Sequence, residues 1–151
     1  MKKIALLSVI VIVIILQFIP VKIPENKETT QDDIVKAGYV NEDISIILKT
    51  SCYDCHSNQS KYPWYSYVAP VKWLVVRDVS KGREELNFSE WNSFDNRRKI
   101  RKLGEIKEQI DKGEMPMSIY TAIHRSAKLS NDQKNVLIAW TEEEQNRIMN
   151  Q

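Results

Sequence analysis

Cysteine and histidine are scarce in this chain, which has only two of each among its 151 residues. The cysteines are Cys52 and Cys55, and the histidines are His56 and His124. A Cys2His2 zinc site is conceivable from this set, but the spacing of 68 residues between the two histidines fits no common zinc finger. A thioredoxin-like redox pair needs a βαβ context, and none is visible. Both alternatives therefore lack the sequence context that they require.

Alternating strand patterns, internal repeats and low-complexity tracts are also missing. Residues 31–151 contain eighteen Lys and Arg against eighteen Asp and Glu, so this part of the chain has no formal net charge. A balanced charge argues against nucleic acid as a partner. No general acid or nucleophile is apparent either, so we expect a protein that is not an enzyme, with a small peroxidase as a minor alternative.

One hydrophobic run opens the chain. Behind Lys2 and Lys3, residues 4–19 are apolar except for Ser8 and Gln17. As a helix these sixteen residues span about 24 Å, near the lower limit for a bilayer core of about 30 Å. We interpret residues 1–19 as an uncleaved signal anchor that forms a single transmembrane helix, because neither a small-residue cleavage site nor a cysteine for lipid attachment follows.

The positive-inside rule places the two lysines in the cytoplasm and the remainder of the chain outside it. The expected location is therefore the inner (cytoplasmic) membrane, single-pass, with the remainder in the periplasm or extracytoplasmic space. Residues 20–30 form a polar linker interrupted by proline. Residues 31–151 are enough for one small domain and too few for two.

Within that domain, segments with helical periodicity alternate with turns, which predicts an all-α fold. Asn41 is placed to cap a short helix that leads to Cys52. Ser130 and Gln133 fit a capping box that opens the last helix. The other expected features are a helix from Pro70 to just before Gly82, a helix through Ile100, Leu103, Ile106 and Ile110 that ends at Gly113, and an apolar side of the last helix made by Val136, Leu137 and Trp140.

The most informative motif is Cys52-Tyr53-Asp54-Cys55-His56. A Cys-x-x-Cys-His run is the attachment signature of c-type haem. Two thiols three positions apart can each add to a haem vinyl group, and the histidine that follows them becomes the proximal ligand of the iron. The motif predicts one covalently bound haem c, attached through Cys52 and Cys55 and ligated by His56. The extracytoplasmic location agrees, because bacteria attach haem to such motifs in that compartment.

Three side chains are candidates for the second axial ligand: Met115, Met117 and His124. Pro116 stiffens the segment that contains the two methionines, which suits a loop that presents a thioether sulfur. We favour Met115 over Met117, so that both His56 and Met115 ligate the iron, although methionines are also common core residues. His/Met ligation raises the reduction potential, whereas an open sixth position suits ligand binding or sensing.

Several further residues have weaker predicted roles. Some of the rings of Tyr62, Trp64, Tyr65 and Tyr67 are expected to pack on the porphyrin edge, and Arg77 or Lys72 are candidates to pair with a haem propionate. The basic run of residues 97–102 is interpreted as a solvent-exposed helix face, with contact to anionic lipid as an alternative.

Longer stretches of the chain resemble the bacterial haem-binding domain family, a group of small c-type cytochrome-like domains. The resemblance is carried by SCYDCHSNQSKYPWYSYVAPVKWLV and GREELNFSEW, by the later GEMP and by KLSNDQKNVLIAW, and it runs from about residue 40 to residue 145. It implies covalent haem on Cys52 and Cys55 with His56 as axial ligand, and its GEMP position matches Met115.

These observations together predict a small cytochrome c-like helical domain behind a membrane anchor, which carries one electron on a covalent haem. The expected partners are redox proteins of the cell envelope. The alternatives are a haem-based sensor or ligand-binding domain and a haem subunit of a larger oxidoreductase.

Overall fold

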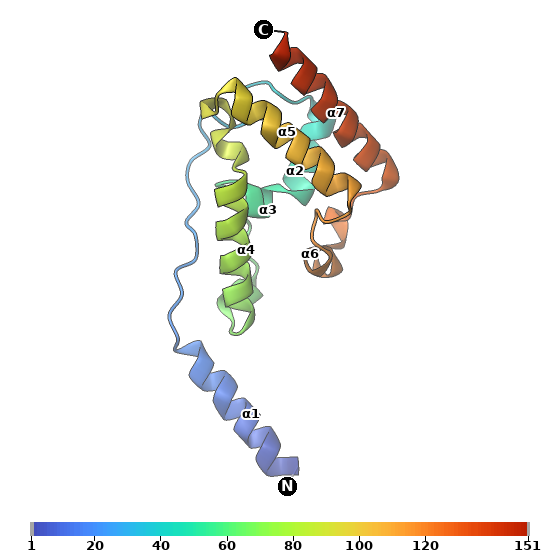
Figure 1. Ribbon diagram of the computed structural model, residues 1–151. Helices are drawn as coiled ribbons and strands as arrows, with labels where there is room; N and C mark the ends of the chain where they lie inside the picture. Colours follow the sequence, from blue (N-terminus) through green and yellow to red (C-terminus); the bar gives the residue numbers. More distant parts are fainter. Residues whose placement is uncertain (1, 151) are drawn as a thin grey trace.

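Every regular element of the chain is helical in the computed structural model, which describes residues 2–150 (Figure 1). The all-α prediction is therefore confirmed. The helices are, in chain order, α1 (Lys2–Gln17), α2 (Glu42–Ser51), α3 (Tyr53–His56), η1 (Trp64–Tyr67), α4 (Val71–Glu85), η2 (Phe88–Ser93), α5 (Asn96–Asp111), α6 (Ser118–Ile123), η3 (Arg125–Ala127) and α7 (Asn131–Met149), where η marks 3-10 helices.

The core forms where α5 and α7 pack against each other and against α2 and η2. Leu103 of α5 and Leu137 of α7 are fully buried, and so is Trp91 of η2. Side chains three and four positions apart share one face of a helix, so the apolar spacing in the sequence directs these residues into one interior. Val136 differs from the prediction because it lies on the exposed side of α7.

Polar caps fix the starts of α2 and α7 where the sequence predicts them. The Asn41 side chain accepts a hydrogen bond of 2.9 Å from the Ile44 N–H, and Ser130 and Gln133 form a reciprocal capping box. Gly113 follows α5 with a φ of +69°, a conformation that glycine adopts without a steric penalty. The predicted end of α4 before Gly82 is wrong, because this helix continues to Glu85.

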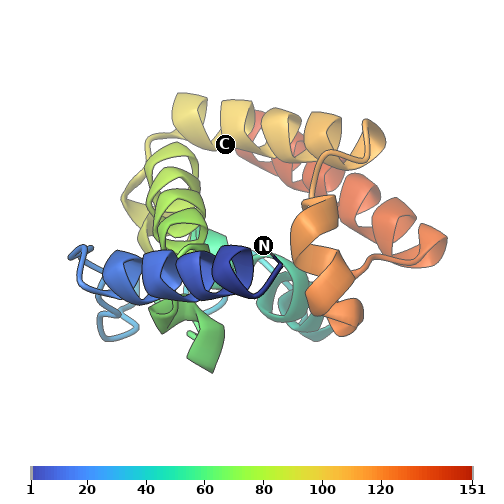
Figure 2. The same cartoon turned by 90° about the horizontal axis from the view of Figure 1, so that it is seen from below.

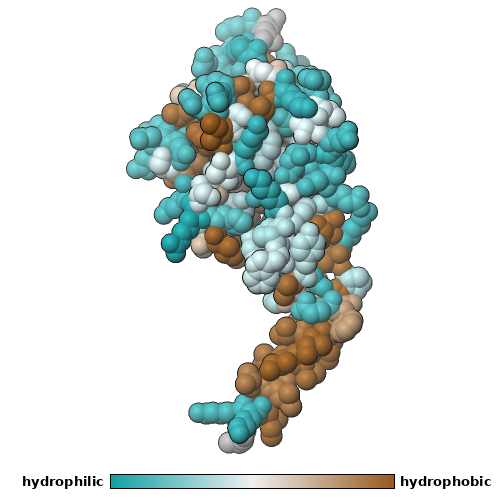
Figure 3. All heavy atoms as spheres, turned by 180° about the vertical axis from the view of Figure 1, so that it is seen from behind, coloured by the Kyte–Doolittle hydropathy of each residue, from teal (hydrophilic) through white to brown (hydrophobic). Residues whose placement is uncertain are grey.

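The apolar helix α1 projects from the domain (Figure 1), and hydrophobic side chains cover the part of it seen in Figure 3. Its end is fixed by the Lys72 ammonium, which donates to the carbonyls of Gln17 (3.0 Å) and Ile19 (2.9 Å). The helix expected over residues 4–19 therefore stops at Gln17. Within residues 2–150 no helix combines the length and the apolar character needed to cross a membrane, so the expected transmembrane helix is not supported.

Residues 20–30 have no regular secondary structure; they run along α4 (Figure 1) and are bound to it. The Arg83 guanidinium donates to the carbonyl of Glu25 (2.8 Å) and to the side chain of Asn26 (3.1 Å). Tyr62 donates to the carbonyl of Pro24 at 2.6 Å. The segment expected as a linker at residues 20–30 is thus in contact with the loop that follows the Cys-x-x-Cys-His motif.

Candidate functional site

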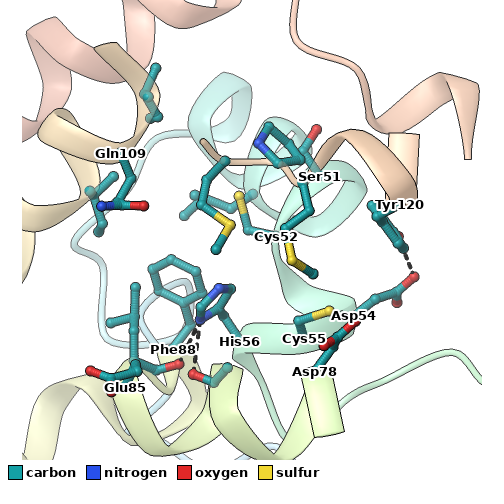
Figure 4. Close-up of a pocket in the computed structure, with 18 of the residues that line it drawn as sticks. Ser51, Cys52, Asp54, Cys55, His56, Asp78, Glu85, Phe88, Gln109 and Tyr120 are labelled. Atoms are coloured by element: carbon teal, nitrogen blue, oxygen red, sulfur yellow. Dashed lines mark hydrogen bonds between the residues drawn. The ribbon is translucent and has the colours of Figure 1, made fainter. Parts of the chain in front are cut away.

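A cavity of about 580 Å³ opens between α3, α4, α5 and the segment before α6. This volume lies within the range of cofactor pockets. Figure 4 shows Cys52, Cys55 and His56 at its wall, with Gln109 of α5 projecting from another side. The apolar side chains that line it include those of Leu48, Leu86, Phe88, Ile106, Ile110, Leu129 and Leu137. The cavity thus combines an apolar lining with two thiols and an imidazole.

The His56 imidazole is held in one orientation and one tautomer. Its Nδ1 lies 2.9 Å from the carbonyl oxygen of Gly82 and 3.1 Å from that of Leu86. Because a carbonyl only accepts, Nδ1 must carry the proton and donate it, which leaves the lone pair on Nε2. Burial lowers the pKa of His56, so the ring stays neutral. A neutral imidazole whose other nitrogen is bound to backbone carbonyl is the usual state of a metal-ligating histidine.

Gly82 explains why α4 can approach the motif so closely. A Cβ atom at this position would lie 2.5 Å from the carbonyl oxygen of Cys55, which is closer than atoms in contact can come. The glycine therefore lets the α4 backbone lie directly against the motif. This contact brings the Gly82 carbonyl within reach of the His56 ring.

The two variable residues of the motif each bind another part of the chain. The Tyr53 hydroxyl donates to the carboxylate of Asp33, at 3.1 and 3.2 Å, and its ring stacks on Phe88. Asp54 accepts a hydrogen bond of 2.7 Å from the hydroxyl of Tyr120 in α6 (Figure 4). The motif is thereby fastened on one side to the segment before α2 and on the other to the helix that follows the methionine segment.

The pKa values of both cysteine thiols are raised, so the thiols stay protonated before any cofactor is attached. Burial, with a smaller contribution from the neighbouring Cys55, raises the pKa of Cys52 to about 12. Burial, followed by the charges of Asp54 and Asp78, raises the pKa of Cys55 to about 11. Neutral thiols inside an apolar cavity are inert until a reactive partner enters it.

The structure brings Met115 and Met117 to the same cavity as Cys52, Cys55 and His56. Met117 also lines a second, smaller cavity of about 180 Å³. His124 lines only this second cavity, where Tyr65 hydrogen-bonds to its Nε2 and Tyr120 stacks on its ring at a centroid distance of 4.3 Å. The alternative in which His124 ligates the iron is therefore not favoured by the geometry.

The expected aromatic cover differs from the arrangement found. Tyr62 and Tyr65 line the second cavity, and Trp64 and Tyr67 are exposed, so none of the four contributes to the main cavity. Of the two basic residues expected near a propionate, Arg77 lines the main cavity. Lys72 instead binds the end of α1.

Gly82, Tyr120 and Lys102 are among the residues of the site that were not predicted. Gly82 and Tyr120 are far from the motif in sequence, and no local pattern connects them to it. Lys102 could have been recognised, because it lies one residue before Leu103 and four before Ile106, on the apolar side of α5. The expected exposed face of residues 97–102 is therefore only partly right, since Lys99 and Lys102 are both buried.

A haem fits the residues that the cavity presents. Its vinyl groups are the reaction partners of a paired thiol motif, and the free Nε2 of His56 is the kind of donor that binds haem iron. The thioethers of the two methionines offer a second axial donor, and the apolar lining suits a large flat ring.

Comparison with known proteins agrees with this site. The sequence pattern of the haem-binding domain family matches residues 11–143. The chain is also 26% identical over 122 residues to the cytochrome c peroxidase Ccp of Escherichia coli (strain K12), an alignment that covers 77% of the chain and 26% of that protein. The chain thus spans about a quarter of the length of this relative. No solved structure matches. With a fitting cavity and a family pattern that covers most of its length, the chain belongs to the haem-binding domain family.

Proposed function

We propose that the chain is a monohaem c-type cytochrome domain that carries electrons outside the cytoplasm. In this proposal Cys52 and Cys55 form thioethers to one haem, His56 ligates the iron on one side and Met115 ligates it on the other. The observation that carries the proposal is the His56 ring, whose Nδ1 is fixed to two backbone carbonyls beside both thiols of the only cysteine pair in the chain.

The bound haem supplies an iron that accepts and returns one electron. The chain holds and tunes it. The carbonyls of Gly82 and Leu86 keep His56 neutral and oriented, and the apolar lining excludes water from the metal. Electron transfer needs no proton donor or nucleophile at the iron.

Covalent attachment is tested on the full chain produced by cells that export it and attach haem. The purified protein is extracted with acid–acetone, which removes haem that is not covalently bound. The pyridine haemochrome spectrum of the extracted protein is then expected to show haem. Cys52→Ala and Cys55→Ala should each shift this spectrum because one thioether is lost. A protein that is correctly exported and holds no covalent haem would refute the proposal.

The second axial ligand is tested with two matched variants. Met115→Ala should change the reduced spectrum markedly and lower the reduction potential, because a thioether ligand favours ferrous iron. Met117→Ala removes the same type of side chain from the same cavity, and it should leave the reduced spectrum and the reduction potential nearly unchanged. If Met117→Ala alone has the effect, Met117 is the ligand. If neither variant has one, the sixth position is open and a sensing role replaces electron transfer.

A peroxidase role is the second candidate, because the chain resembles part of a protein that bears this name. Such an enzyme needs an open iron with acid–base groups beside it. His124, the only other histidine, lies in the second cavity. We therefore expect a six-coordinate spectrum and no consumption of hydrogen peroxide by the isolated chain. Rapid peroxide turnover with a five-coordinate spectrum would favour the peroxidase instead.

We also propose that α1 attaches the chain to the cytoplasmic membrane, with the haem domain on the extracytoplasmic side and redox proteins of the cell envelope as partners. The support is an isolated helix whose large apolar side chains are exposed along its length, behind Lys2 and Lys3. An aqueous environment around such a helix is unfavourable, and lipid removes that cost.

A further inference from the structure

Lys102 is the most deeply buried of the basic side chains that line the haem cavity. Its side chain is only 7% exposed, whereas that of Arg77 is 61% exposed and paired with Asp78 at 2.8 Å. Lys81 is exposed as well. Water screens an exposed charge strongly and a buried charge weakly. Among the cations of the cavity wall, Lys102 is therefore the one whose charge water screens least.

The carboxylates beside Lys102 compensate its charge only in part. Its Nζ lies 2.6 Å from Glu105 and 3.9 Å from Glu85. These two carboxylates are 43% and 74% exposed, so water screens them more than it screens the ammonium.

We infer that Lys102 acts as a fixed buried charge, which raises the reduction potential of the haem held by His56. The inference rests on the proposed haem site. Ferric haem carries one more positive charge than ferrous haem, so a nearby ammonium destabilises the ferric form and favours uptake of an electron. The one-electron step is otherwise unchanged: the iron gains an electron from the redox partner and no bond of the protein is broken.

The test is a spectroelectrochemical titration of the full chain with haem attached. Lys102→Gln removes the charge and also leaves Glu105 without its cation, so both effects favour ferric haem. We expect the ferric-to-ferrous equilibrium to shift at least tenfold toward ferric, which corresponds to 59 mV for one electron. Lys102→Arg keeps the charge and should keep most of the potential.

Two further variants separate this effect from a general disturbance. Glu105→Gln leaves Lys102 in place with its charge less compensated, so the potential should rise. Lys107→Gln removes a lysine of the same helix that pairs with Glu142 outside the cavity, and it should leave the potential unchanged. The rise in Glu105→Gln also tests the inference if Lys102→Gln fails to fold.

The outcomes distinguish the inference from the function on which it rests. Absence of haem in the unmodified chain would refute the proposed function. A haem-loaded Lys102→Gln with the unmodified absorption spectrum and an unshifted potential would overturn the role of Lys102 alone. So would an equal shift in Lys107→Gln, or a Glu105→Gln variant whose potential does not rise.

Discussion

At the scale of single residues, the site depends on one position that must lack a side chain. Gly82 lies inside a helix, where glycine is unfavourable by about 1 kcal/mol relative to alanine. Glycine at this position allows α4 to approach the Cys55 carbonyl closely. The same approach brings the Gly82 carbonyl within hydrogen-bond distance of His56. Sequence alone could not reveal this role, because a contact between residues 55 and 82 leaves no local periodic signal.

Gly82→Ala should therefore destabilise the haem-free protein by about 1–3 kcal/mol, as overpacked sites do. Urea denaturation of the reduced protein measures this free energy of unfolding. Gly104→Ala is the matched control, because its added Cβ would meet only the flexible Gln145 side chain, at 3.4 Å. That variant should be neutral or gain up to about 1 kcal/mol of stability. Equal stability of the two variants would contradict the close-approach argument.

The thiols give a second prediction at this scale, which concerns pH. Their pKa values of about 12 for Cys52 and about 11 for Cys55 lie above the ordinary value of 9.0, because burial penalises the thiolate. In the haem-free protein, alkylation by iodoacetamide should stay slow until the pH nears 11, and Cys55 should react before Cys52. Mass spectrometry of timed samples measures both rates.

The same raised pKa values fix the sign of a stability change. A thiol that is harder to ionise in the folded state makes folding less favourable once the unfolded chain ionises. Stability of the haem-free protein should therefore be retained below pH 9 and fall as the pH rises from about 9 through 11 and 12. In urea, both thiols should react with the pH profile of an ordinary cysteine, whose pKa is 9.0. Fast alkylation of the folded protein at pH 8 would refute the burial of the thiols.

At the scale of elements, helix ends and apolar faces were largely predictable, whereas the contacts that join elements were not. Asn41 and the Ser130–Gln133 box act within one turn of their own helices, so their sequence spacing is sufficient to identify them. Arg83 acts over 57 and 58 residues, on Asn26 and Glu25. Nothing in PVKIPENKETT indicates that this segment is bound, and composition alone predicted a linker.

Arg83→Ala should release this segment from α4, because four hydrogen bonds from the guanidinium are lost, to Glu25, Asn26, Ser57 and Ser60. Trypsin should then cleave after Lys22 and Lys27 several-fold faster than in the unmodified protein. Lys81→Ala is the control, since it removes an exposed basic residue of the same helix. A cleavage rate unaffected by Arg83→Ala would show that other contacts hold the segment.

At the scale of the whole molecule, a mostly polar domain carries one apolar helix, α1, which is nearest the viewer in Figure 2 and projects from the domain in Figure 3. Hydropathy identified this run, and the helical state followed from its length. The end of this helix at Gln17 could not be predicted from hydropathy. It depends on Lys72 and Ala69, which lie far along the chain and hydrogen-bond to Gln17. The domain thus determines where the apolar helix stops.

Membrane attachment through α1 predicts that the full chain floats with lipid vesicles in a density gradient. Ile10→Asp combined with Ile14→Asp should abolish flotation, since each aspartate at the centre of an apolar helix costs about 3 kcal/mol in lipid. Val136→Asp places the same charge at an exposed apolar position of α7 and should have no effect. Flotation of the double variant would show that α1 is not the attachment site.

The hydrogen bonds of Tyr53 and Asp54 limit how far this motif can be exchanged with others. The two positions between the cysteines are free in the general attachment signature, yet here one is committed to Asp33 and the other to Tyr120. A motif transplanted from a c-type cytochrome would keep the thiols and the histidine but lose both tethers. An exchange of the motif that keeps its tethers therefore requires residues 33 and 120 to be replaced together with residues 52–56.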